Sequence, residues 1–509
     1  AFRGGSLCSL ELETWHLSLL QRYFFVSRQA NNWIIFFVIR REPLLLHLNL
    51  EIMSIAEFYE LFLRHPHIST DTRHLVKDSM FFALKGATFD GNQFALQALE
   101  AGCAYAVVDD AQIAQQDERC ILVEDVLISL QILAGYHRRQ LDTPILQITG
   151  TNGKTTTKEL VAAVLAEKFN VLFTEGNLNN HIGVPLTLLR LTEEHEFAVI
   201  ETGANHVGEI ALLSSIVKPN CGLITNVGKA HIEGFGSFEG VIQAKTELYE
   251  NIRKRNMELL EEVDGNVQFR EGTTPLFIFL NGDNPHLAPR AEGLPTLTYG
   301  SPDHGYVIEG EVVSCAPFLT FRWRKNGGQW HEVATQLIGA YNLDNALAAV
   351  LVGLTYNVHV ASIDKALRNY TPNNNRSEYR KTQRNRLIID AYNANLSSMH
   401  AALHSFAQTE DVHKMMILGD MRELGTASAD AHAEVLQLAL TTGCQQVWLV
   451  GSEFAQALNT LSVDQAALFR TFSDVEAVKA ELKAQPLNDH LILIKGSNGT
   501  RLFQLPELL

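Results

Sequence analysis

The sequence predicts an α/β protein of three domains: a smaller α/β N-terminal domain, a central P-loop domain with a parallel sheet, and a Rossmann-like α/β C-terminal domain. A length of 509 residues is sufficient for domains of about 150 residues each. Short apolar runs alternate with helical patterns, which is typical of parallel sheets with crossover helices. One such run opens "ILQITGTNGKTTTKEL" at 145–160, where a glycine-rich turn, a lysine and three threonines precede a helical pattern.

Residues 1–52 differ from the rest of the chain. Their apolar core, Trp33 to Ile39, is too short to span a bilayer, and its basic residues follow it instead of preceding it as in a secretory signal. Met53 then opens "MSIAEFYELFLRHP", which resembles a natural protein start. We expect residues 1–52 to be a non-native or unstructured extension without a catalytic role; a membrane anchor is the alternative.

The remaining chain divides by pattern into 53–131, 132–370 and 371–509, with a polar stretch at 371–380 before the last unit. In the first unit, β-like runs at 80–84 and 104–108 flank a helical stretch at 94–102, and an amphipathic helix at 123–140 follows. In the second unit we expect strands at 145–149, 197–201 and 221–227, helices from about Thr156 and at 237–252, hairpins within 306–333 turning at Asn326-Gly327-Gly328, and a helix at 341–354. In the third unit, strand-like runs lie at 386–392, 415–420, 446–451 and 491–497.

Composition excludes several kinds of partner. The net charge is −16 and there is no long basic block, so a nonspecific grip on nucleic acid or on an anionic membrane is not expected. The six cysteines are scattered without a metal-binding spacing, which is typical of reduced thiols. We therefore expect a cytoplasmic protein with no nucleic-acid partner and no membrane insertion.

The segment Thr149 to Thr155 is the predicted phosphate site. Its glycines let backbone N–H groups converge on phosphate oxygens, and the following helix contributes a favourable dipole. Lys154 is expected to bridge the β and γ phosphates of ATP or GTP, and the Thr155 hydroxyl is expected to bind Mg²⁺. Ile148 replaces the usual first glycine, so the loop is a variant; the alternative is a glycine-rich turn with a surface lysine.

Two further residues follow apolar runs, where open parallel sheets place ligand sites. Glu201 ends "FAVIE" and His231 follows "LITNVGKA", and both are expected to bind Mg²⁺; a capping glutamate and a packed histidine are the alternatives. Lys245 lies about one helix beyond His231. Because a free ammonium beside Mg²⁺ is repelled, chemistry alone favours a solvated lysine on a helix face.

At this point the residues resemble a family. The segments are "STDTR", "GTNGKTT", "GNLNNHIGVPLTLL", "ETGANHVGEI", "TNVGKAHIEGFGSFEGVIQAKTELY", "GAYNLDNALAA", "NNRSEYR" and "IDAYNANLSSM". In this order, from about Met53 to the C-terminus, they resemble the Mur ligases of peptidoglycan synthesis.

The resemblance implies specific roles. ATP would be bound by Gly150, Thr151, Asn152, Gly153, Lys154, Thr155, Thr156, Asn342, Asn345, Arg376 and Asp390, with Lys154 on the transferred group, the two asparagines toward adenine, and Arg376 and Asp390 on phosphates and ribose. Mg²⁺ would be bound by Thr155, Glu201, His231 and Lys245, the lysine as a carbamate formed with CO₂. Lys154, Lys245, His231 and Glu201 would be catalytic. The uridine substrate would meet Thr70, Asp71, Thr72 and Arg73, with Asn179, Asn180 and Asn393 as further substrate contacts.

The resemblance also implies the reaction. "STDTR", "GNLNN" and "DAYNAN" are typical of the family member that joins D-alanyl-D-alanine to the UDP-N-acetylmuramoyl-tripeptide carboxylate through an acyl phosphate, and we expect a monomer. Thr202 stands where the family often has Met, Leu396 where Pro is common, and "LIKGSNGTRL" matches only in part; these departures concern the dipeptide pocket.

Three alternatives remain open. The preceding Mur ligase would carry Asp-Asn-Pro-Arg in its last domain, whereas "GDNPHL" here lies in the middle domain with His286 in place of Arg. Folylpolyglutamate synthase lacks the "STDTR" unit. A P-loop switch or regulatory ATPase would share the nucleotide residues but not the domains for carboxyl substrates.

Overall fold

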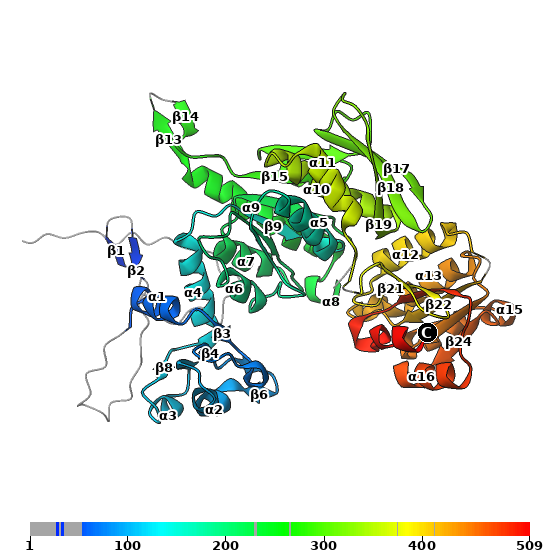
Figure 1. The fold of residues 1–509 in the computed structure, drawn as a ribbon, viewed down its shortest axis with the longest axis horizontal. Helices are drawn as coiled ribbons and strands as arrows, with labels where there is room; N and C mark the ends of the chain where they lie inside the picture. The colour runs from blue at the N-terminus through cyan, green and yellow to red at the C-terminus, as the bar shows by residue number, and fades with distance from the viewer. Residues whose placement is uncertain are drawn as a thin grey trace, which may run out of the picture. The chain divides into compact units, whose positions relative to one another are not determined.

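The computed structural model describes residues 27–29, 32–34, 53–228, 232–263, 266–373, 375–411 and 413–509. The chain forms two compact units, Ala1–Ser129 and Leu130–Leu509 (Figure 1). Within the first 52 residues, β1 (Ser27–Gln29) and β2 (Asn32–Ile34) pair antiparallel. The other residues of 1–52, for which we expected an extension without structure, lie outside the described residues.

The first unit contains a small parallel sheet with the strand order β3-β4-β7-β8. The bounds are α1 Ile55–Arg64, β3 Ile68–Ser69, β4 Met80–Phe82, β5 Lys85–Gly86, β6 Phe89–Asp90, α2 Ala95–Glu100, β7 Tyr105–Val108, α3 Ala111–Ala114 and β8 Cys120–Leu122. Phe81, Leu99 and Val108 pack in its core. The strands and the helix predicted from the apolar runs are confirmed.

A nine-stranded sheet forms the centre of the second unit, in the order β10-β11-β9-β12-β15-β16-β17-β18-β19. Strands β10 to β17 of this order pair in parallel, and β17, β18 and β19 pair antiparallel. The bounds are β9 Ile145–Thr149, β10 Val171–Phe173, β11 Phe197–Glu201, β12 Cys221–Ile224, β15 Phe277–Asn281, β16 Thr296–Gly300, β17 Ile308–Cys315, β18 Phe318–Lys325 and β19 His331–Ile338. The hairpins predicted in 306–333 are confirmed.

Helices cover both faces of this sheet because the side chains of each strand alternate between faces. Leu223 of β12 packs in one core with α5 and α10, whereas its neighbour Ile224 packs in the other with α7 and α9. The helices are α4 Val126–Arg139, α5 Lys154–Ala166, α6 Gly183–Leu188, α7 Glu209–Val217, α8 Ile232–Phe235, α9 Phe238–Glu258, α10 Leu343–Thr355 and α11 Val360–Asn369; β13 Leu260–Val263 pairs with β14 Asn266–Phe269. The helix expected from Thr156 begins at Lys154, because the chain turns helical directly after Gly153.

A second sheet, with the order β20-β21-β25-β22-β23-β24, forms the C-terminal part. Only the edge strand β20 is antiparallel. The bounds are β20 Glu378–Lys381, β21 Arg386–Asp390, α12 Leu396–Gln408, β22 Lys414–Gly419, α13 Ser428–Leu440, β23 Gln446–Val450, α14 Ser452–Ala457, α15 Val463–Ala466, β24 Phe469–Phe472, α16 Val475–Ala484 and β25 Leu491–Lys495. The last strand of the chain, β25, lies between β21 and β22. The carboxyl ends of these three parallel strands are therefore neighbours. This is the doubly wound arrangement that the sequence predicts.

The two sheets of the second unit correspond to the expected central and C-terminal domains, and their boundaries at 131 and 370 stay predictions. The five cysteines that the structure describes are free thiols. No helix in the described part of the chain has the length and apolarity that a bilayer span requires.

Candidate active site

The glycine-rich loop after β9 has a positive φ, which favours glycine, at two positions. Gly150 has φ of +144° and Gly153 has φ of +77°. A Cβ atom at Gly150 would lie 2.0 Å from the Thr225 hydroxyl, and one at Gly153 would lie 2.6 Å from Asn345 Oδ1. Conformation and close packing therefore both require glycine in this loop.

We expect Gly153→Ala to lower the affinity for ATP at least tenfold and to destabilise the fold by about 1–3 kcal/mol, because the left-handed backbone and the contact with Asn345 both oppose a methyl group. Calorimetric titration with ATP and thermal unfolding measure the two effects. Gly176→Ala is the matched control, since Gly176 also has a positive φ, of +52°, but a Cβ there meets nothing within 4 Å. Equal losses of ATP affinity in both variants would contradict the expectation.

Asn226, which follows β12, holds the loop in shape. Its backbone carbonyl accepts from Thr151 N (2.9 Å), its Oδ1 accepts from Asn152 N (3.0 Å), and its Nδ2 donates to Asn152 O (3.0 Å). Asn226 is not among the predicted site residues, although it lies in "LITNVGKA", where a polar side chain close to the end of an apolar run was its signal.

Lys154 opens α5 and folds back over the loop. Its Nζ donates to Gly150 O (2.8 Å) and Thr151 O (3.0 Å). Burial lowers the pKa of this lysine to about 8, while the nearby Glu201 carboxylate acts in the opposite direction. The ammonium is thus held where a phosphate group on the loop would meet it.

Two buried oxygens beside Lys154 have no hydrogen-bond partner among the described residues: Thr155 Oγ1 and Glu201 Oε2. Glu201 ends β11 and its other oxygen, Oε1, accepts from Asn179 Nδ2 at 2.8 Å. A buried carboxylate oxygen and hydroxyl without partners fit a hard cation that prefers oxygen ligands. In the described chain, acidic, histidine and cysteine side chains form no group of three or more that could hold a metal ion; His231 lies outside the described residues.

Lys245, in the middle of α9, is buried, with only 2% of the residue exposed. Its Nζ donates to Ala204 O (3.2 Å) and lies 5.1 Å from the centre of the Phe235 ring. Burial, assisted by the charge of Lys154, lowers its pKa to about 7. The solvated helix-face lysine that chemistry alone favoured is therefore wrong, because this face of α9 packs on the sheet.

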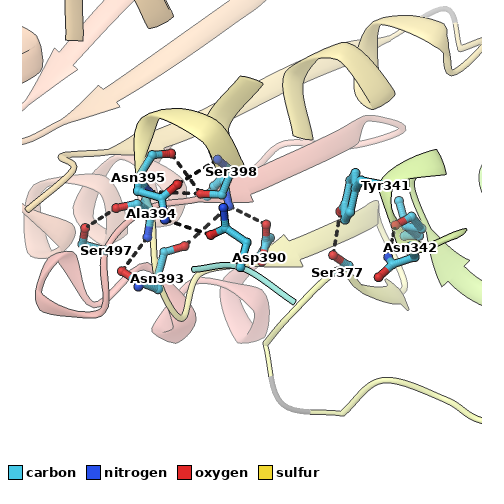
Figure 2. Close-up of polar contacts among 12 residues, drawn as sticks. Tyr341, Asn342, Ser377, Asp390, Asn393, Ala394, Asn395, Ser398 and Ser497 are labelled. Atoms are coloured by element: carbon cyan, nitrogen blue, oxygen red, sulfur yellow. Dashed lines mark hydrogen bonds and ion pairs between the residues drawn. The ribbon is translucent and has the colours of Figure 1, made fainter. Parts of the chain in front are cut away.

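The C-terminal part contributes a second wall. The Arg376 guanidinium lies 3.9 Å from the centre of the Tyr392 ring, and Lys495 Nζ lies 2.5 Å from Asp390 Oδ2. Tyr341 and Ser377 share a hydrogen bond of 2.7 Å. Figure 2 shows this pair, and Asp390 at the start of the turn that carries Asn393.

Two sets of hydrogen bonds shape this region, one between this wall and the phosphate loop and one within the central part. Asn395 Nδ2 donates to Asn152 Oδ1 (2.8 Å), so the turn before α12 reaches the phosphate loop directly. On the other side, Asn345 accepts from Thr157 Oγ1 (2.9 Å) and donates to Asn342 Oδ1 (2.8 Å). The asparagines predicted to contact the nucleotide are therefore tied to the phosphate-loop helix.

A cavity of about 550 Å³ joins these elements. The predicted residues that line it are Gly150, Thr151, Asn152, Gly153, Lys154, Thr156, Asn179, Asn180, Glu201, Lys245, Asn342, Asn345, Arg376, Asp390 and Asn393. Tyr341, Tyr392 and Lys495 also line it and were missed; Lys495 ends an apolar run, which was its only sequence signal.

The predicted uridine contacts lie in the first unit. Asp71 caps a short 3-10 helix at Thr72–His74, accepting from Arg73 N (2.9 Å), and its carboxylate pairs with the Arg73 guanidinium. This hydrogen-bonded ion pair holds the pKa of Asp71 well below its usual range. Thr70 to Arg73 thus form one local motif on their own unit.

Comparison with known proteins gives the class of protein that this fold and site define. Family models match three stretches: "Mur ligase family, catalytic domain" at 66–138, "Mur ligase middle domain" at 148–353 and "Mur ligase, glutamate ligase domain" at 375–498. The chain belongs to the Mur ligase family.

Within the family, the chain resembles proteins named UDP-N-acetylmuramoyl-tripeptide–D-alanyl-D-alanine ligase. It is 34% identical to that of Bacillus subtilis over 471 residues, 89% of this chain and 97% of the relative, and 32% identical to that of Escherichia coli over 452 residues, 87% and 93%. A crystal structure of MurF from Acinetobacter baumannii matches with a TM-score of 0.73 and 30% identity over 86% of this chain and 92% of that one. MurF from Thermotoga maritima in complex with ADP shares the fold, with a TM-score of 0.73 and 23% identity over 88% of this chain and 97% of that one.

Proposed function

We propose that this chain is an ATP-dependent ligase that joins D-alanyl-D-alanine to UDP-N-acetylmuramoyl-tripeptide, forming ADP and phosphate. The observation that carries the proposal is the cavity that unites the phosphate loop, Glu201 with its partnerless buried oxygen, and the basic residues Arg376 and Lys495 of the C-terminal part. Relatives that bear the name of this activity match along nearly their whole length.

The reaction follows from carboxylate activation. The γ-phosphoryl group passes from ATP to the terminal carboxylate of the tripeptide, which forms an acyl phosphate and ADP. The amine of D-alanyl-D-alanine attacks the acyl carbon and loses a proton, and the tetrahedral intermediate expels phosphate as the amide forms. The protein's task is to align the groups and to stabilise negative charge.

Lys154 and the loop N–H groups supply part of that charge stabilisation, and Arg376 supplies more from the opposite wall of the cavity. Thr155 and Glu201 would hold Mg²⁺, which would screen the phosphate oxygens, and we assign His231 to the same ion. Enclosure between the two walls keeps water from the acyl phosphate.

We assign Lys245 as the carbamylated lysine. A neutral amine adds to CO₂ and releases one proton, so the product is an anionic carbamate. The depressed pKa of Lys245, about 7, supports this assignment because the reactive neutral amine is abundant near neutral pH. The conversion also replaces a buried cation near Lys154 by an anion that Mg²⁺ attracts.

Substrate contacts are proposed from both units. We assign Thr70, Asp71, Thr72 and Arg73 to the uridine nucleotide, and Asn180 and Asn393 to the peptide substrates. Asn179 serves the site indirectly as well, since it holds Glu201. We propose that the protein works as a monomer in the cytoplasm.

The activity is tested with ATP, UDP-N-acetylmuramoyl-tripeptide and D-alanyl-D-alanine, added singly and together. We expect phosphate release that needs all three, with a product heavier than the tripeptide substrate by the dipeptide minus one water. Release that is indifferent to D-alanyl-D-alanine would refute the proposal. Release supported by a single amino acid and the UDP-dipeptide would favour the preceding Mur ligase.

The carbamate predicts a dependence on both CO₂ and pH. Below pH 7 the Lys245 amine is protonated and cannot add CO₂, whereas above pH 7 it is neutral and can. In CO₂-depleted buffer, with bicarbonate added to give the same dissolved CO₂ at both pH values, we expect kcat to rise severalfold at pH 8.5 and to change little at pH 6. The same bicarbonate response at both pH values would contradict this assignment.

A further inference from the structure

An ion pair joins the ends of two neighbouring strands in the wall of the cavity. Lys495 ends β25 and Asp390 ends β21, and the two residues are direct partners in the parallel register. The Lys495 side chain is 1% exposed, and its Nζ donates to Asp390 Oδ2 at 2.5 Å. The same Nζ lies 3.5 Å from Asn393 O, so it contacts both the carboxylate and the turn that follows β21.

This contact leaves the carboxylate with one oxygen available. Asp390 lines the cavity with a side chain 17% exposed, and among the contacts of the described residues its Oδ1 has none. A charge-assisted hydrogen bond on Oδ2 restricts rotation of the carboxylate about its side-chain torsions. Because Asp390 lines the cavity, its Oδ1 can accept from a hydroxyl group bound there.

We propose that Lys495 is a positioning residue for the nucleotide: its ammonium fixes Asp390 so that Oδ1 accepts from the ribose hydroxyls. The inference rests on the proposed function and on the expectation from the sequence that Asp390 contacts the ribose. Lys495 itself does not touch the nucleotide. Its effect on binding passes through the orientation of Asp390 and of the turn at Asn393.

A purely structural lysine offers the contrast. Lys414 begins β22, the strand beside β25, and is also buried, with 7% exposed. Its Nζ donates to the backbone carbonyls of Phe406 (3.2 Å) and Ala407 (3.1 Å), and it contacts no carboxylate of the described residues. Lys414→Met therefore reports what the loss of a buried ammonium does to this sheet without any change at Asp390.

The test compares the binding of ADP with that of 2′,3′-dideoxy-ADP to the full chain by calorimetry. The unmodified protein is expected to prefer ADP. In Lys495→Met, ADP should lose about tenfold more affinity than the dideoxy nucleotide, because the lost contact involves the hydroxyls. Because both nucleotides carry the same phosphates, the ratio of the two affinities cancels any general effect of the substitution on phosphate binding. Lys495→Arg should restore most of the ratio, and Lys414→Met should leave it unchanged.

An unchanged ratio in Lys495→Met would overturn the proposal and make Lys495 structural. If that variant does not fold, Lys495→Arg and Asp390→Asn decide. Asp390→Asn keeps the shape of the side chain but should lower the ratio of the two affinities. A normal ratio in Asp390→Asn would refute the positioning role of Lys495. The readout needs no dipeptide. The two proposals can fail separately. If the unmodified protein has no ligase activity but Lys495→Met loses the preference for ADP over dideoxy-ADP, the proposed function is refuted and the role of Lys495 is supported.

Discussion

Lys245→Ala is expected to be nearly inactive, with kcat lowered by about 10³-fold, the range seen when one electrostatic stabiliser is removed from an active site. The substitution removes the carbamate anion and leaves a space inside the site, since Lys245 is buried against Ala204 and Phe235. A small carboxylate such as formate can occupy that space and replace the lost charge. We therefore expect formate to restore part of kcat in a saturable manner, measured as phosphate release.

The control is Lys158→Met, which removes another fully buried ammonium of the same unit. Lys158 Nζ donates to Thr174 O (2.7 Å), and it has no part in the proposed chemistry. We expect Lys158→Met to lose thermal stability and to gain nothing from formate. Full activity of Lys245→Ala, or equal rescue of both variants, would refute the carbamate assignment.

Lys154→Met is expected to lower kcat by about 10³-fold, because phosphoryl transfer depends on cations placed against the transferred group. The Nζ of Lys154 now donates to two carbonyls of the loop itself, so ATP can replace these contacts without moving the backbone. The methionine approximates the aliphatic part of the lysine side chain and removes the ammonium, both its charge and its hydrogen-bond donors. Rapid-quench measurement of acyl phosphate formation separates this step from amide formation.

Lys168→Met provides the comparison for that measurement. Lys168 lies just beyond the other end of α5 and donates to the carbonyls of Tyr356 (3.0 Å) and Asn357 (3.2 Å). We expect its kcat to stay within about twofold of the unmodified protein, as for a surface lysine. A comparable loss in both variants would show that positive charge in and around α5, and not Lys154 in particular, supports the transfer.

Local patterns predicted the elements of the fold well. The apolar runs at 145–149 and 197–201 correspond residue for residue to β9 and β11, because turn residues or polar residues bound each run. The helix after the phosphate loop was placed two residues late, since Lys154 and Thr155 have no apolar character by which periodicity could detect them. The expected strand at 221–227 was too long, because Thr225 to Val227 leave the sheet to support the loop.

Burial of polar groups was less predictable. Lysine is usually a surface residue, and only the packing of α9 against β12 and α7 buries Lys245. Lys495 and Asp390 are 105 positions apart, and their pairing depends on the insertion of β25 beside β21. A single sequence carries no local signal for such a register.

The sequence by itself determined the phosphate loop, the succession of strands and helices, and the family resemblance, because each depends on residues close together along the chain. Only the tertiary structure decided which strand ends are neighbours, and therefore which side chains share the cavity. The physical reason is that parallel sheets order their strands through crossovers of many residues. Burial then lowers the pKa of Lys154 and of Lys245, which no property of the isolated residues prescribes.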